Sequence, residues 1–300
     1  MASDSIRIFE VGPRDGLQNE PRLLSLADKE WLVRSLFKTG IKDVEVGAFV
    51  RPDRVPQMAN TDALLKRIPN LGTSWCLVPN RVGLERALKV GVTHFAVFTA
   101  ATDSFARNNI GMTTQESLVE FREVIAQAKA ELGTRLKVRG YVSTAFGCPF
   151  EGRVSAQKAL RVIEKLANLG IHHISIGDTL GVANPRDVEL LLKQSFKFLP
   201  VKNTAVHFHD TRGTALANTL RAIDMGVRII DSSVGGLGGC PFAPGAAGNL
   251  ATEDLVYMLD GMKMKTGVHL EELCKVSLKL SRKIKHPLTS RYLQAYVSKS

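Results

Sequence analysis

Two histidines lie one residue apart in the stretch Ala205-Val206-His207-Phe208-His209-Asp210. The stretch begins apolar and breaks at Thr211-Arg212-Gly213, which is typical of a β-strand that ends in a loop. Because alternate side chains of a strand point to one face, His207 and His209 aim at the same point. Two imidazoles on one face form half of a metal site, whereas a lone histidine is more often an ordinary, partly buried residue.

Asp15 supplies a candidate carboxylate for such a site. It follows the alternating stretch 6–11 and the break at Gly12-Pro13, although Asp15-Gly16 by itself also fits a simple turn. With Asn249 as a fourth ligand through its carbonyl oxygen, Asp15 and the two histidines form a mixed oxygen and nitrogen set. Such a set suits Mg²⁺ or Mn²⁺ better than a thiolate zinc site.

Arg14 and Cys240 are candidates for chemistry beside the metal. The Arg14 guanidinium can hold a carbonyl oxygen that becomes an enolate oxygen, the alternative being a solvated surface arginine. Cys240 lies in the glycine-rich stretch 235–241, which can move over a substrate and carry a thiol with it. The alternative is a small buried residue in an irregular loop. Cys76, inside an apolar stretch, is expected in the core.

Strand and helix patterns alternate along the whole chain, and glycines end several of the helices. We expect strands over residues 6–11, 44–46, 74–78, 94–99, 136–143, 172–176, 204–209 and 228–232. We expect helices after Ser25 and over residues 61–68, 81–90, 114–132, 155–169, 185–199 and 214–225, from near Asn249, and over 270–286.

Eight such repeats predict one domain, a closed (β/α)₈ barrel over about residues 6–265, with a C-terminal extension over 266–300 that holds an extra helix. A doubly wound open sheet is the alternative, but no G-x-G-x-x-G fingerprint follows the first strand. Chemistry in such a barrel sits at the carboxyl ends of the strands. That face receives Arg14 and Asp15 after the first strand, Glu45 in the second and Asp178 after the sixth.

The composition of the 300 residues, 44% hydrophobic and 23% charged, is that of a globular protein with a sizeable core. No apolar run reaches about 18 residues and no secretory pattern opens the chain, so we expect a cytoplasmic protein that does not enter the membrane. The net charge of +11 comes without a basic stripe or nucleic-acid motif, which argues against nucleic-acid binding and fits an anionic substrate. The four cysteines are far apart and contain no C-x-x-C pair.

Several longer motifs resemble those of the 3-hydroxy-3-methylglutaryl-CoA lyase family, from about residue 6 to 265. The Cys240 loop, Ala217-Asn-Thr-Leu220 and the stretch 248–257 are specific to these lyases, whereas the arginine-aspartate pair and H-x-H are shared with a wider group of barrel metalloenzymes. The resemblance rests on residues 11–20, Phe49-Val50 with 55–58, 140–143, 147–152, 177–179, 206–211 and 235–241.

The resemblance implies a hydroxymethylglutaryl-CoA lyase, which cleaves 3-hydroxy-3-methylglutaryl-CoA to acetyl-CoA and acetoacetate with a divalent cation, Mg²⁺ or Mn²⁺. A place in leucine catabolism and a homodimer are implied as well. By this resemblance the metal ligands are Asp15, His207, His209 and Asn249. Arg14 stabilises the enolate, and Arg14 and Gln18 contact the substrate. Glu45, Asp178 and Cys240 help in proton transfer and positioning. A metal that chelates the tertiary hydroxyl and the carboxylate acidifies that hydroxyl, and loss of its proton drives the cleavage.

Some residues depart from the family pattern. Gly47-Ala48 stands where these lyases usually carry small hydroxyl residues, which predicts a larger and drier acyl pocket, and Arg212 replaces a usual tyrosine. Arg212 then reaches a substrate carboxylate or CoA phosphate, or points into solvent. A lyase for another 3-hydroxy-3-alkylglutaryl-CoA and a Claisen-type condensing synthase therefore stay open as alternatives. The condensing relatives usually continue H-x-H with Asn-Asp, but here Asp210 follows at once.

Overall fold

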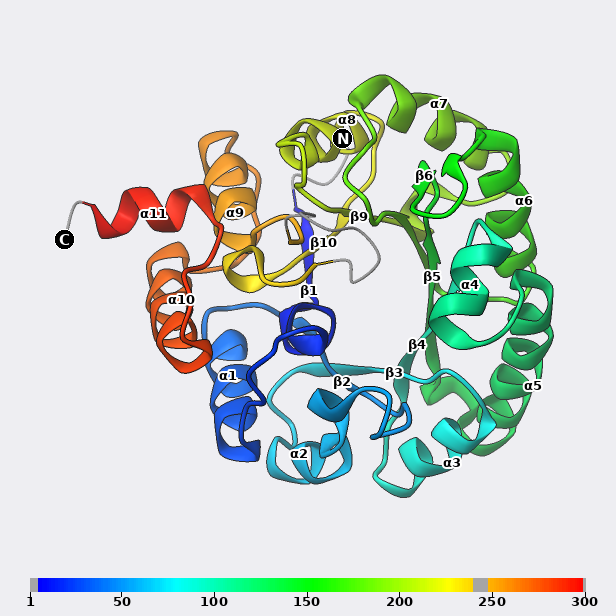
Figure 1. Cartoon of the computed structure of the whole chain (residues 1–300), viewed down its shortest axis with the longest axis horizontal. Coiled ribbons are helices and arrows are strands. Elements are labelled where there is room, and N and C mark those ends of the chain that lie inside the picture. Colours follow the sequence, from blue (N-terminus) through cyan, green and yellow to red (C-terminus); the bar gives the residue numbers. More distant parts are fainter. Residues whose placement is uncertain (1–4, 240–247, 299–300) are drawn as a thin grey trace.

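The computed structural model describes residues 5–239 and 248–298, and its centre is a closed barrel of parallel strands (Figure 1). β1 pairs with both β2 and β10, which closes the barrel. The predicted fold is therefore confirmed. In chain order the barrel strands are β1 (Arg7–Glu10), β2 (Asp43–Ala48), β3 (Thr73–Leu77), β4 (His94–Ala100), β5 (Lys137–Ser143), β8 (His173–Asp178), β9 (Thr204–Phe208) and β10 (Ile229–Ser232).

Helices surround the barrel as an outer ring, and two more follow at the C-terminal end (Figure 1). The ring consists of α1 (Leu26–Lys38), α2 (Thr61–Arg67), α3 (Arg81–Lys89), α5 (Thr114–Leu132), α6 (Ala156–Ala167), α7 (Pro185–Ser195), α8 (Ala215–Asp224) and α9 (Thr252–Gly261). The expected extra helix is α10 (Leu270–Ile284), which packs against α1 and α9. A further helix, α11 (Arg291–Val297), contacts α9 and projects from the barrel.

The helix boundaries follow from local capping chemistry. Ser25 accepts a hydrogen bond from the Asp28 N–H at the start of α1, as its sequence position predicts. Asn184 caps α7, whose first residue is Pro185, where the missing N–H costs no helical bond. After α1 the chain turns at Gly40 with φ of +98°, a conformation that a side chain rarely adopts.

Several short elements were not predicted. The stretch after β1, expected as a loop, forms a π-helical turn over Gly12–Gly16, and the stretch after β4 forms helix α4 (Asp103–Ile110). A small antiparallel hairpin joins β6 (Gly147–Cys148) to β7 (Gly152–Arg153). The five-residue turn and the two-residue strands are too short to show the hydrophobic periodicity from which the barrel was predicted.

Large side chains from alternate strands fill the lower part of the barrel. Phe9 on β1 contacts Trp75 on β3 at a ring distance of 5.4 Å, and the Arg139 guanidinium on β5 lies 3.8 Å from the Phe9 ring centroid. The barrel is therefore a packed core that supports a site at its upper end. Within residues 5–239 and 248–298, no helix combines the length and apolarity that a membrane span requires.

Candidate metal centre and active site

Asp15, His207 and His209 meet at the carboxyl end of the barrel. Candidate ligand atoms of the three side chains all lie within 4.8 Å of one another. Asp15 comes from the π-helical turn after β1, His207 from β9, and His209 from the residue that follows β9. The convergence predicted from the strand pattern is thus present in the structure, and it joins the two ends of a chain segment almost 200 residues long.

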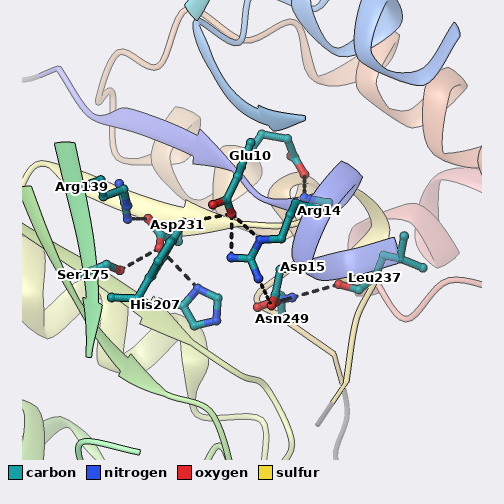
Figure 2. Close-up of polar contacts among 12 residues, drawn as sticks. Glu10, Arg14, Asp15, Arg139, Ser175, His207, Asp231, Leu237 and Asn249 are labelled. Carbon is teal, nitrogen blue, oxygen red and sulfur yellow. Dashed lines mark hydrogen bonds and ion pairs between the residues drawn. The ribbon is translucent and has the colours of Figure 1, made fainter. Parts of the chain in front are cut away.

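Asn249 belongs to the same cluster (Figure 2). Its Nδ2 donates to Asp15 Oδ2 at 2.8 Å and to the Leu237 carbonyl at 3.1 Å, and its backbone forms a bridge with His209. Asn249 Oδ1 is buried and has no hydrogen-bond partner among the described residues. A buried acceptor without a donor carries a large desolvation cost, which a bound cation would relieve.

The donor set fits a hard divalent cation. A carboxylate, two imidazoles and an unpaired amide oxygen match the oxygen and nitrogen ligands of Mg²⁺ or Mn²⁺. Burial alone would raise the pKa of Asp15, but Arg14 and the two histidines lower it to about 2. Asp15 is therefore ionised and ready to ligate at neutral pH.

Arg14 is held rigidly beside Asp15. Its Nη1 donates to Asp15 Oδ1 at 2.9 Å, while its Nε and Nη2 contact Glu45 Oε2 at 2.7 and 2.6 Å. Tyr141 donates to the same Glu45 oxygen at 3.1 Å. Burial would lower the pKa of Arg14, but attraction to Glu45 and Asp15 raises it above its ordinary value. The solvated alternative for Arg14 is therefore wrong, since the side chain is a buried, permanent cation at the site.

A cavity of about 140 Å³ opens beside these residues. Gln18, predicted to contact substrate, lies on its wall together with Arg14, Asp15 and His209. The rest of the wall is mainly apolar and comes from β3, β4, helix α4 and the loops after β2 and β3. It is lined there by Val50, Val55, Leu77, Pro79, Phe98, Phe105 and Ile110. A cavity with charged groups at one end and an apolar wall suits an anionic acyl substrate.

Asp178 and Cys240 are not part of the described cluster. The Asp178 carboxylate accepts the N–H groups of Val182 at 3.1 Å and Ala183 at 2.8 Å, so it holds the loop after β8. Its catalytic role stays a prediction. Cys240 lies outside the described residues, and the preceding Gly239 lines the cavity.

The structure bears on two expectations about substrate recognition. A Cβ on Gly47 would lie 2.5 Å from Thr61 Oγ1, so Gly47 makes room for Thr61 and does not enlarge an acyl pocket. Arg212 Nη1 donates to the carbonyls of Leu180 and Gly181, at 3.1 and 3.0 Å. Arg212 is exposed, as the solvent alternative expected, and its guanidinium also holds backbone of the loop after β8.

Three buried polar residues of the site were missed. Tyr141 holds Glu45, Glu10 accepts N–H groups from Gly12 and Val234 at 2.8 Å each, and Asp231 lies beside His207. The available signal was a charged residue inside an apolar strand, as in Ile229-Ile230-Asp231. Charged residues are almost never fully buried without a partner, so this pattern points to an internal ion pair.

A closed barrel that gathers a carboxylate, two imidazoles and a buried arginine at the carboxyl ends of its strands defines a barrel protein with a candidate divalent-metal site. The chain belongs to the HMGL-like family, whose model matches residues 5–279.

Curated relatives match nearly the whole chain. The hydroxymethylglutaryl-CoA lyase of Pseudomonas mevalonii is 46% identical over 93% of each chain. The mitochondrial hydroxymethylglutaryl-CoA lyase of Homo sapiens is 43% identical over 97% of this chain and 89% of its own length.

Solved structures agree with this assignment. The HMG-CoA lyase of Bacillus subtilis superposes with a TM-score of 0.94 at 43% identity, covering 100% of this chain and 99% of that one. An HMG-CoA lyase of Acinetobacter baumannii, solved in complex with coenzyme A and 3-methylmalate, has a TM-score of 0.92 at 35% identity over 97% of this chain and 95% of its own.

Proposed function

We propose that this protein is a lyase that cleaves 3-hydroxy-3-methylglutaryl-CoA to acetyl-CoA and acetoacetate. The observation that carries the proposal is the convergence of Asp15, His207 and His209 within 4.8 Å beside a buried Arg14. Relatives named for this reaction, 43–46% identical over nearly the whole chain, support the choice of substrate. A bound coenzyme A in one related structure supports the thioester.

A divalent cation, Mg²⁺ or Mn²⁺, would be held by Asp15, His207, His209 and the unpaired Oδ1 of Asn249. When bound, such a cation acts as a Lewis acid that lowers the pKa of a coordinated hydroxyl group. The residues around it do the positioning: the Asn249 amide orients Asp15 through a hydrogen bond of 2.8 Å, and Arg14 takes the other Asp15 oxygen. Both carboxylate oxygens are therefore fixed before a substrate arrives.

Arg14 stabilises the charge that develops during bond cleavage. A base of the site takes the proton of the tertiary hydroxyl, a transfer in which the family resemblance gives a part to Glu45, Asp178 and Cys240. The bond between C2 and C3 then breaks, and its electron pair moves onto the thioester carbonyl oxygen. The fixed Arg14 guanidinium holds that oxygen, and Glu45 with Tyr141 keeps the guanidinium in place. A preorganised donor of this kind is worth about 10²–10³ in turnover. A proton returned to C2 then yields acetyl-CoA, and the family resemblance assigns help with this transfer to Cys240.

The methyl-bearing substrate is favoured over larger 3-alkyl analogues. Gly47 and Ala48 do not widen the pocket, because Thr61 occupies the space that a Cβ on Gly47 would need and Ala48 is part of the buried core. The apolar wall of the cavity is also closed by bulky residues such as Phe98 and Phe105. A condensing synthase stays the second candidate because cleavage and condensation share the same enolate.

The test is to incubate the protein and Mg²⁺ with a panel of 3-hydroxy-3-alkylglutaryl-CoA thioesters and to measure acetyl-CoA. We expect acetyl-CoA from the methyl compound, little from the ethyl and propyl compounds, and none after removal of divalent metal with a chelator. Full activity without divalent metal would refute the assigned metal site. Condensation of acetyl-CoA with a 2-oxo acid, without cleavage of any panel member, would identify a synthase instead.

Light scattering of the same sample tests the homodimer that the family resemblance implies.

A further inference from the structure

Asp231 lies directly beside the metal-ligand candidate His207. Its strand, β10, pairs with β9 in a register that places Asp231 opposite His207. Asp231 Oδ2 is 3.3 Å from His207 Nδ1, and the Asp231 side chain is fully buried. The contact has an ion-pair distance without hydrogen-bond geometry, and His207 Nδ1 has no hydrogen-bond partner among the described residues, so Asp231 is the acceptor that Nδ1 faces and Nε2 remains for another partner.

Two further strands hold the Asp231 carboxylate in place (Figure 2). Ser175 on β8 donates to Oδ2 at 2.7 Å, and the Arg139 guanidinium on β5 forms an ion pair with Oδ1. Arg139 is itself fully buried and stacks over Phe9. Oδ1 is thus paired with a buried guanidinium and Oδ2 accepts the Ser175 hydroxyl, so the side chain faces His207 as a carboxylate acceptor.

We propose that Asp231, held by Arg139 and Ser175, is a positioning residue that fixes His207 as the Nδ1-protonated tautomer, with Nε2 free to bind the divalent cation. A carboxylate oxygen beside Nδ1 favours the proton on that nitrogen, where it can be donated to Asp231, and this selects the tautomer. The link to the cation rests on the metal site of the proposed function, whereas the tautomer does not depend on it. Loss of such an outer partner typically costs about 10–100-fold in metal affinity.

A pair of double variants separates this role from a structural one. Removing one partner alone would leave an uncompensated buried charge, whereas replacing both charges of a buried pair by apolar residues is often neutral for stability. We therefore choose Arg139→Met with Asp231→Leu. The control is Arg7→Met with Asp43→Leu, because Arg7 and Asp43 form an arginine–aspartate pair with contacts of 2.5 and 2.7 Å at the starts of β1 and β2, the opposite end of the barrel.

The first measurement is Mn²⁺ affinity by calorimetry, with melting temperature recorded for each variant. We expect the Arg139/Asp231 variant to bind Mn²⁺ at least about tenfold more weakly than wild type, and the Arg7/Asp43 variant to bind within about twofold. Ser175→Ala, which keeps the ion pair, should weaken binding less than the double variant. Equal Mn²⁺ affinity in wild type and a folded Arg139/Asp231 variant would overturn the link between Asp231 and the metal.

The second measurement needs neither a bound metal nor a variant of the pair. Long-range ¹⁵N–¹H NMR of histidine-labelled, metal-free wild type reports which ring nitrogen carries the proton, and His207→Gln identifies the His207 signals. We expect a protonated Nδ1 and an unprotonated Nε2. A protonated Nε2 at neutral pH would overturn the proposal even if Mn²⁺ binds. If wild type binds no Mn²⁺, the proposed metal site fails, while the tautomer still decides the role of Asp231.

Discussion

Arg14 and Glu45 form the pair of residues on which the charge balance of the site depends. Glu45 is fully buried, and its Oε2 receives contacts from both Arg14 and Tyr141. Removing the guanidinium would leave Glu45 as an unpaired buried carboxylate, which typically costs about 3–5 kcal/mol. A loss of activity in a single Arg14 variant can therefore come from the missing catalytic guanidinium or from lower stability of the fold.

For this reason we predict the behaviour of two variants together. Arg14→Gln should lower turnover about 10²–10³-fold and also lower stability, whereas Arg14→Gln with Glu45→Gln should recover much of the stability but none of the turnover. Mn²⁺ affinity should change by only a few fold in both, because Asp15, His207 and His209 remain. Turnover, urea unfolding and calorimetry measure the three quantities. Recovery of turnover in the double variant would show that Arg14 acts only through folding.

We expect serine substitutions at Cys240 and at Cys76 to have opposite effects on turnover and stability. Cys240→Ser should keep the wild-type melting temperature and lose most turnover, since the proposed role of that thiol is chemical. Cys76 is fully buried in β3, so Cys76→Ser buries a hydroxyl and should cost about 1–3 kcal/mol while turnover per folded molecule is unchanged. Thermal unfolding and assays at matched folded concentration distinguish the two. Wild-type turnover in Cys240→Ser would remove the thiol from the mechanism.

The metal-ligand candidates could be predicted from the sequence, but their supporting residues could not. The spacing of His207 and His209 within one strand identifies them as ligand candidates, and the position of Asp15 directly after a strand identifies it as well. Asp231, Arg139 and Tyr141 act through partners 50 to nearly 100 residues away, on strands that meet only once the barrel has closed. No local pattern carries that information, beyond the presence of a charge in an apolar strand.

At the scale of single elements, β2 shows where alternation along a strand fails. Its register with β3 shifts between Glu45 and Gly47, so residues after the shift no longer face the side that simple alternation predicts. Gly47 consequently faces Thr61 on α2, whose Oγ1 accepts the Ala48 N–H at 3.2 Å and donates to the Met58 carbonyl at 2.9 Å. The expectation that Gly47 enlarges the acyl pocket was wrong for this reason.

Gly47→Ala tests this packing directly. The added methyl group would press on Thr61 Oγ1 and Cγ2, and we expect a loss of about 1–3 kcal/mol in the free energy of unfolding. The KM for 3-hydroxy-3-methylglutaryl-CoA should stay within about twofold of wild type, since Gly47 does not line the cavity. Combining it with Thr61→Ala, which removes the two clashing atoms, should restore part of the stability. A large rise in KM at unchanged stability would place Gly47 in the acyl pocket after all.

At the scale of the whole molecule, barrel closure brings two buried carboxylates to one loop. Glu10, at the end of β1, accepts the Val234 N–H at 2.8 Å and the Thr252 hydroxyl at 2.7 Å. Glu253, at the start of α9, accepts the Gly235 N–H at 2.8 Å. Glu10 thus links the segment after β10 to the turn that presents Arg14 and Asp15, and Glu253 links the same segment to α9 and to Ser277 on α10. The eight repeats predicted closure, but this linkage joins the first strand to residues more than 220 positions later.

These two carboxylates predict how stability changes with pH. Burial raises the pKa of Glu10 to about 7 and that of Glu253 to about 8, against 4.5 for both in the unfolded chain. Between these values the folded state holds protons that the unfolded state has released. The stabilisation is therefore full below about pH 4.5 and is lost as pH rises through 7 and 8.

We expect the free energy of unfolding to fall by a few kcal/mol between pH 6.5 and pH 9, because each unit of pKa shift corresponds to about 1.4 kcal/mol. Glu253→Gln keeps an amide oxygen for Gly235 and cannot ionise, so its decline over this range should be clearly smaller. Glu271→Gln, at an exposed position on α10, is the matched control and should follow wild type. Urea unfolding at the two pH values measures all three proteins. An equal decline in wild type and Glu253→Gln would mean that Glu253 is already ionised at pH 6.5, and that the loop after β10 is held by a buried charge at neutral pH.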